Sequence, residues 1–160
     1  TIVGFVSLIA CSDILQAINE TNPTIVHFSG HGTADGDLVL LNPDGSAKLV
    51  SKEAISMAMA TASDTIRLVV FNACFSEPQA ESVVEHIDSA IGMSTSIGDE
   101  AACVFASQLY SSIGFGRSLQ TSFNQALAQL MLEGIPEDST PRLYVKDSMD
   151  ANDITLVQPK

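Results

Sequence analysis

The chain has 160 residues, 46% of them apolar, and a formal net charge of −12. This length and apolar share fit one globular domain with a continuous core. The excess of acidic side chains repels phosphate backbones and anionic lipid surfaces, which argues against nucleic-acid and membrane partners. No run approaches the roughly 18 apolar residues that a membrane helix needs, and residues 1–10 lack the basic leader of a signal peptide.

The three cysteines are an odd number without the spacing of a disulfide framework, which favours a reducing compartment. We therefore predict a cytoplasmic location. The sequence starts at Thr1 and runs directly into a strand-like segment. We expect residues 1–160 to form a single domain that is a C-terminal fragment, an effector part or a processed product of a longer polypeptide.

Apolar runs alternate with segments of helical period along the whole chain. This alternation is typical of an α/β fold with a mostly parallel sheet. The turn at residues 42–45, which contains Pro43 and Gly45, is expected to close a small hairpin. The predicted strands, in chain order, are residues 2–9, 24–28, 38–41, 66–71, 90–93 and 142–145.

Helices are predicted between these strands. Ser12 or Asp13 is expected to cap a helix that runs through residue 19, and Ser51 is expected to cap the next one. Two further segments each carry an apolar stripe at helical spacing, which is typical of amphipathic helices. These segments are residues 99–112 and 117–133.

Two of the predicted strands lead to chemically active side chains. The strand at 24–28 runs into His31, and the strand at 66–71 runs into Cys74. Adjacent parallel strands end at the same edge of a sheet, so we expect these two residues to meet there. An imidazole within hydrogen-bond reach of a thiol supplies a general base beside a nucleophile.

The residues after Cys74 predict the start of a helix. Ser76 and Gln79 match a capping box, in which the hydroxyl and the amide side chain satisfy amides of the first turn. The partial positive charge of a helix N-terminus stabilises a nearby thiolate, which is the reactive form of the thiol. The alternative interpretation makes Cys74 a small core residue, and we assign Cys11 and Cys103 to that class.

The three histidines have different sequence contexts. His31 lies between Gly30 and Gly32, which permit a tight turn and leave the backbone open to a docked molecule. His27 precedes it by four residues, but in a strand that spacing separates two side chains by about 13 Å. We therefore predict no metal site. His27 is predicted to be a core or supporting residue, and His86 is predicted to be solvated.

Several segments resemble the CHAT family of caspase-like cysteine peptidases. The two core motifs are His-Phe-Ser-Gly-His-Gly at residues 27–32 and Val-Val-Phe-Asn-Ala-Cys-Phe-Ser at residues 69–76. The resemblance implies a caspase-hemoglobinase fold, a three-layer α/β/α sandwich, and cleavage of proteins without a metal or organic cofactor. Further similarity lies at Phe105, Tyr110 and residues 91–93, 98–102, 116–118 and 140–143.

The resemblance also implies roles for individual residues. Cys74 would be the nucleophile and His31 the base and general acid, with the backbone amides of Gly32 and Cys74 forming the oxyanion hole. Related enzymes use an acidic side chain to recognise a basic residue before the scissile bond, and Asp99 is similarly placed. Asp99 is equally consistent with the N-cap of the helix that follows it.

The expected partners follow from the same resemblance. Members usually carry an additional N-terminal strand and helix, and they are commonly effector domains of bacterial signalling or immune proteins. We therefore expect a protein or peptide substrate, together with a sensor domain or partner protein that covers an exposed sheet edge. The alternative hypothesis is a catalytically silent interaction scaffold with the same fold.

Overall fold

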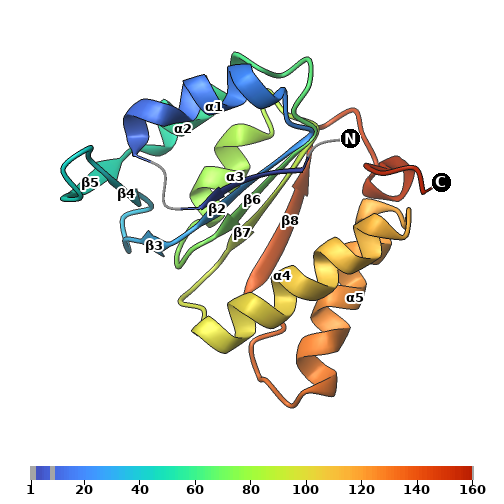
Figure 1. Cartoon of the computed structure of the whole chain (residues 1–160). Coiled ribbons are helices and arrows are strands. Elements are labelled where there is room, and N and C mark those ends of the chain that lie inside the picture. The colour runs from blue at the N-terminus through green and yellow to red at the C-terminus, as the bar shows by residue number, and fades with distance from the viewer. Residues whose placement is uncertain (1–2, 8–9, 160) are drawn as a thin grey trace.

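A five-stranded sheet forms the centre of the computed structural model, which describes residues 3–7 and 10–159 (Figure 1). The first four strands in spatial order are parallel, and the fifth is antiparallel to its neighbour. The predicted α/β class with a mostly parallel sheet is therefore confirmed. In spatial order the strands are β1 (Val3–Ser7), β2 (Ile25–Ser29), β6 (Leu68–Asn72), β7 (Ser89–Met93) and β8 (Pro141–Val145).

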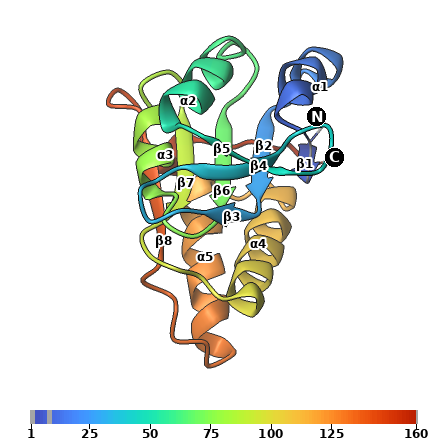
Figure 2. The same cartoon turned by 90° about the vertical axis from the view of Figure 1, so that its left-hand side faces the viewer.

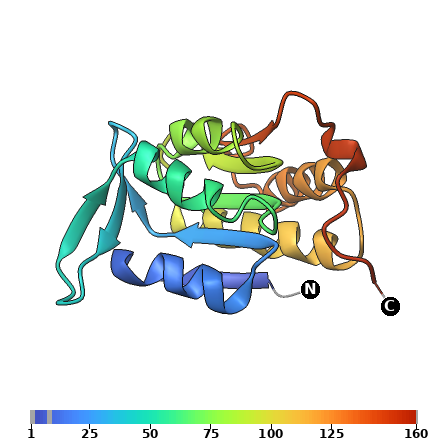
Figure 3. The same cartoon turned by 90° about the horizontal axis from the view of Figure 1, so that it is seen from above.

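Helices cover both faces of this sheet and complete the three layers (Figure 1). Leu68 and Val70 of β6 pack into the core beneath α4 and α5, whereas Val69 and Phe71 pack toward the other three helices. The alternation follows from the two-residue period of a strand. One layer consists of α1 (Ile14–Thr21), α2 (Lys52–Ala60) and α3 (Glu77–Val83), seen from above in Figure 3, and the other of α4 (Asp99–Gly114) and α5 (Leu119–Leu132).

A second, smaller sheet lies across the carboxyl ends of the parallel strands (Figure 2). It is antiparallel and contains β3 (His31–Gly32), β4 (Leu38–Leu41) and β5 (Ala47–Val50). The predicted hairpin turn is confirmed, because the Gly45 N–H donates to Asn42 O at 2.9 Å. The sequence predicted only β4 of these strands, since β3 has two residues and β5 is largely exposed.

The observed strands of the main sheet agree with the predicted ones to within about two residues. The prediction for residues 2–9 is confirmed at β1, while its residues 2, 8 and 9 lie outside the described part. Two short 3-10 helices, Cys11–Asp13 and Ala151–Asp153, were not predicted. None of the helices in the described residues is long and apolar enough to cross a membrane.

One predicted helix cap is confirmed and another is wrong. The Ser51 hydroxyl accepts the N–H of Ala54 at 3.2 Å and so caps α2 as predicted. Asp13 occupies the N-cap position of α1, but its side chain makes no capping bond. The preceding 3-10 turn holds Asp13 at φ −102° and ψ −7°, rather than in the extended conformation that side-chain capping requires.

The assignment of Cys103 to the core is also wrong. Cys103 lies on α4 between the buried residues Ala101 and Phe105, but it faces solvent. A helix on the outside of a sheet buries one stripe only, and Cys103 falls on its opposite side. Cys11 is half-buried, and His86 is exposed as predicted.

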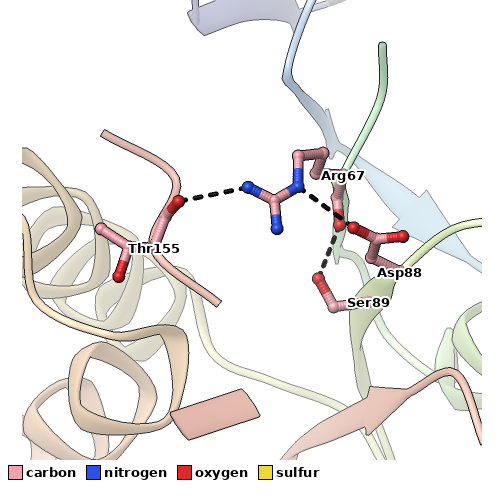
Figure 4. Close-up of polar contacts among 4 residues, drawn as sticks. All are labelled: Arg67, Asp88, Ser89 and Thr155. Atoms are coloured by element: carbon pink, nitrogen blue, oxygen red, sulfur yellow. Dashed lines mark hydrogen bonds and ion pairs between the residues drawn. The ribbon is translucent and has the colours of Figure 1, made fainter. Parts of the chain in front are cut away.

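The amino ends of β6 and β7 are joined by a polar network (Figure 4). Arg67 Nε lies 3.1 Å from Asp88 Oδ2, and Arg67 Nη1 donates to Thr155 O at 3.2 Å. The Ser89 hydroxyl donates to Arg67 O at 2.7 Å. The network therefore fastens the C-terminal segment to the sheet at the end opposite the small sheet.

Candidate active site

The segments that carry His31 and Cys74 lie side by side at the carboxyl edge of the main sheet. Ser29 of β2 pairs with Asn72 of β6, and each candidate residue follows two positions later. Gly32 then packs against Cys74 so closely that an added Cβ would be 1.9 Å from Cys74 O. Only glycine fits here, because the opposing atom belongs to the backbone and cannot rotate away.

The side chains of the two residues are not hydrogen-bonded to each other within the described residues. Cys74 is half-buried, and its Sγ lies 3.4 Å from Ile97 N and 3.7 Å from Ile97 O. The Ile97 N–H is a donor that stabilises negative charge on the sulfur. His31 is exposed, so packing does not fix the orientation of its imidazole.

Two backbone N–H groups near Cys74 face away from the ladders around them. The Cys74 N–H has no hydrogen-bond acceptor among residues 3–7 and 10–159. The Thr33 N–H donates to Asp37 O at 2.9 Å, so the preceding pair of Gly32 with Leu38 is a non-hydrogen-bonded pair of the ladder. The Gly32 N–H therefore points away from β4. These are the two donors that the family resemblance assigns to an oxyanion hole.

The turn after Cys74 is held in an uncommon conformation. Phe75 has φ 55°, in the left-handed region that non-glycine residues rarely adopt. Its N–H donates to Thr95 O at 3.2 Å, which ties the turn to the loop after β7. A residue in this region costs about 1 kcal/mol or more and persists only where its surroundings enforce it.

The capping box predicted for Ser76 and Gln79 does not form. Ser76 Oγ lies 2.9 Å from Phe71 O and 2.7 Å from Ala73 O, and it accepts the Met93 N–H at 3.0 Å. The hydroxyl contacts buried backbone groups of β6 and β7, while the Gln79 N–H of the first turn donates instead to Ser76 O at 3.1 Å. Ser76 thus links the end of β6 to the end of β7. The Gln79 side chain points elsewhere, toward the small sheet.

A buried polar group lies below this edge on the α4 side of the sheet. Asn72 donates from Nδ2 to Ala102 O at 3.0 Å, while its Oδ1 has no partner in the described part of the chain. His27 Nδ1 lies 2.6 Å from the Tyr110 hydroxyl. Burial lowers the pKa of His27 to about 4 and raises that of Tyr110 above its ordinary range. At neutral pH both groups are therefore uncharged.

His27 is buried as predicted, whereas Asn72, which is also buried, had no predicted role. The available signal was a polar residue at the last position of an apolar strand, two residues before the candidate nucleophile. Such a residue in a fully buried strand needs a partner.

Asp99 is not the N-cap of α4, so that prediction is wrong. The N-cap is Gly98, whose N–H donates to Glu137 Oε1 at 2.8 Å, and Asp99 is the exposed first residue of the helix. A carboxylate in a first turn interacts favourably with the helix dipole. Asp99 lies two residues after Ile97, the residue that contacts the Cys74 sulfur.

Within the described residues, no group of three or more histidine, cysteine or acidic side chains is arranged to hold a metal ion.

The fold of the chain is that of a three-layer α/β protein (Figure 1). It is similar to the structure of a secreted C11 cysteine protease from Bacteroides thetaiotaomicron, determined in complex with an irreversible peptide inhibitor. The two chains are 12% identical with a TM-score of 0.57, and the match covers 84% of this chain and 44% of that one. The present chain thus spans less than half the length of that structure.

The sequence itself defines the family. The CHAT domain matches residues 7–145, which is most of the chain, and the protein therefore belongs to the CHAT domain family. This result confirms the resemblance that the two core motifs indicated. No curated protein matches the sequence.

Proposed function

We propose that the chain is a cysteine endopeptidase domain that uses Cys74 and His31. The observation that carries this proposal is the direct contact between the Gly32 backbone and the Cys74 carbonyl at the edge where β2 and β6 end. Membership of the CHAT domain family and the caspase-like fold support it.

The reaction would proceed in two stages. The Cys74 thiolate attacks the scissile carbonyl carbon, and the N–H groups of Gly32 and Cys74 bind the oxygen that becomes negative. His31 gives its proton to the leaving amine as the carbon–nitrogen bond breaks and a thioester forms. Water then attacks the thioester and passes a proton to His31, and the carbon–sulfur bond breaks to release the acid and restore the thiolate.

A labelling experiment with an electrophilic peptide tests this proposal. It compares the wild type with Cys74→Ala and His31→Ala. An electrophilic peptide is expected to react with Cys74 and not with Cys103, which is exposed on α4 and serves as an internal control thiol. Cleavage of a proteome is expected to fall at least about 1,000-fold in Cys74→Ala. If a folded Cys74→Ala variant generates the same new protein termini as the wild type, the proposal is contradicted.

The scaffold alternative has one observation in its favour. Within the described residues the Cys74 sulfur contacts Ile97 and is not bonded to His31. A silent scaffold predicts that the electrophilic peptide labels Cys74 no faster than Cys103. Selective labelling that depends on His31 would exclude it.

We further propose that Asp99 recognises a basic residue before the cleaved bond. Its support is the exposed carboxylate at the start of α4, close in sequence to the residue that contacts the sulfur. The chain's net charge of −12 also favours a basic substrate. In a peptide library, the wild type is expected to prefer Arg or Lys, and Asp99→Asn is expected to lose that preference. Equal cleavage after apolar residues would rule out this assignment.

We also propose a biological setting for the domain. An effector domain of a larger bacterial protein, held inactive by a sensor domain or partner over the sheet edge, would act in the cytoplasm. To test this setting, the full-length protein is purified with its bound partners, with and without the signal that activates it. The labelling of Cys74 is then compared between the two preparations.

A further inference from the structure

Gln79 connects the helix that follows Cys74 to the loop that follows His31. Its side chain is fully buried, and its Nε2 donates to Gly36 O in the turn between β3 and β4. Gln79 lies five residues after Cys74, and Gly36 lies five residues after His31. The bond therefore joins the two segments that carry the candidate dyad.

The turn that Gln79 holds is itself well ordered by hydrogen bonds. The Gly36 N–H donates to Thr33 O at 2.9 Å, and the Asp37 N–H donates to Thr33 Oγ1 at 3.2 Å. Gly36 has φ +87°, and a Cβ added there would be 3.4 Å from Pro78 Cγ. The turn is thus packed against the first turn of α3 as well as bonded to it. A shift of α3 would carry the turn with it.

His31 depends on such attachments because the main sheet does not hold it. Among the described strands, β3 is paired with β4 and not with any strand of the five-stranded sheet. Among the contacts in the described residues that link this segment to the segment of Cys74 are Gly32 against Cys74 O and Gln79 with Gly36 O. The first prevents closer approach, and the second prevents separation.

A glutamine is energetically unfavourable at this buried position if its side chain only fills space. Its Oε1 is buried and has no partner in the described part of the chain. An unsatisfied buried oxygen opposes folding, whereas methionine would fill a similar volume without that penalty. The amide is therefore best explained by what its N–H group does.

We propose that Gln79 is a positioning residue that sets the place of His31 relative to Cys74. The proposal rests on the proposed peptidase function and extends it to a residue outside the reacting groups. Within the described residues, Gln79 forms no hydrogen bond with the Cys74 sulfur or the His31 imidazole. It acts by holding the β3–β4 turn at a fixed distance from the turn that carries the nucleophile.

The test compares Gln79→Met with the wild type, with His31→Ala and with Ser122→Ala. Ser122 is the matched control, because its hydroxyl is buried on α5 and has no partner among the described residues. The first measurement is the rate at which iodoacetamide alkylates Cys74 as a function of pH. The second is peptide turnover, separated into kcat and KM. A thermal melt of each variant shows that it is folded.

Gln79→Met is expected to move the pH profile of alkylation toward that of His31→Ala, because the imidazole no longer supports the thiolate. We expect kcat to fall about 10- to 100-fold with KM changed less than about threefold. Ser122→Ala is expected to match the wild type in both measurements. A merely structural defect would lower the melting temperature without moving the pH profile.

The outcomes separate two failures. If the wild type and His31→Ala have the same alkylation profile, the proposal that His31 and Cys74 act as a dyad is wrong. The positioning role of Gln79 is then overturned as well. If those two profiles differ and Gln79→Met follows the wild type, the dyad stands and the positioning role alone is overturned.

Discussion

The two ends of the main sheet are built in different ways. At the amino end, Arg67, Asp88 and Ser89 bond to one another and to the C-terminal segment. At the carboxyl end, Phe75 is in a left-handed conformation, and Asn72 and Gln79 each keep a buried oxygen without a partner in the described residues. Strain and unsatisfied polar groups tend to concentrate where a protein acts. Under the proposed function, the carboxyl edge is the one expected to affect catalysis, and the amino edge is not.

The largest expected effect comes from Gly32→Ala. The new methyl group would meet Cys74 O at 1.9 Å, so the segment carrying His31 must move away from Cys74. A displacement of about 1 Å at a reacting pair can cost about 100-fold in rate, and we expect at least that loss in peptide turnover.

The control for this prediction is Gly114→Ala. A Cβ at Gly114 meets nothing within 4 Å, so turnover is expected to stay at the wild-type value. If Gly32→Ala also cleaves at that value, the close contact at the carboxyl edge has no catalytic meaning.

The next effect concerns pH and the buried His27. The unfolded chain binds a proton at this side chain near pH 6.5, whereas burial in the folded protein lowers the pKa to about 4. Acid therefore favours the unfolded state, and the stabilisation present above pH 6.5 is lost as the pH falls toward 4. The loss from this group approaches about 3 kcal/mol.

Urea denaturation of the wild type and His27→Gln at pH 7 and pH 4.5 isolates this contribution. Glutamine does not titrate, so the variant is expected to lose less stability between the two pH values. Equal losses in both proteins would mean that His27 is not held neutral by burial.

A smaller effect is expected for Ser76→Ala. The variant leaves the Met93 N–H without its hydroxyl acceptor in a buried place and frees the two carbonyls at the end of β6. The free energy of unfolding is expected to fall by about 1–3 kcal/mol. Chemical denaturation measures this, and a loss no larger than that of Ser122→Ala would show that the link between β6 and β7 carries little energy.

The smallest effect is expected at the amino end. Arg67 and Asp88 are partly exposed, with side-chain exposures of 39% and 27%, so their ion pair contributes less than about 1 kcal/mol. A double-mutant cycle with Arg67→Gln and Asp88→Asn gives the coupling energy. Peptide turnover is expected to be unchanged in the two single variants and the double variant. A reduced rate would show that the amino end of the sheet also affects turnover.

The main sheet was predictable because its strands are continuous apolar runs. In β6 every residue is buried, and a parallel strand covered on both faces needs such a run. The same signal placed His31 and Cys74 at one edge, since both follow strands of this kind.

The side-chain bonds of the edge were not predictable from local patterns. Ser76 and Gln79 match a capping box, but each bonds to a backbone group brought near by tertiary structure. The contact of Gly32 with Cys74 O likewise depends on the crossing of the small sheet over the main one. At these positions the requirement of buried backbone groups for hydrogen-bond partners outweighs the local sequence preference.

The C-terminal segment has a practical consequence for anyone who prepares this domain. The CHAT domain match stops at residue 145, yet Ala151, Ile154 and Leu156 are buried in the core, and the Leu119 N–H donates to Ile154 O at 2.8 Å. A fragment trimmed at the boundary of the match would expose one side of α5 to water. Expression boundaries for this protein should follow the packing and retain the segment through Leu156.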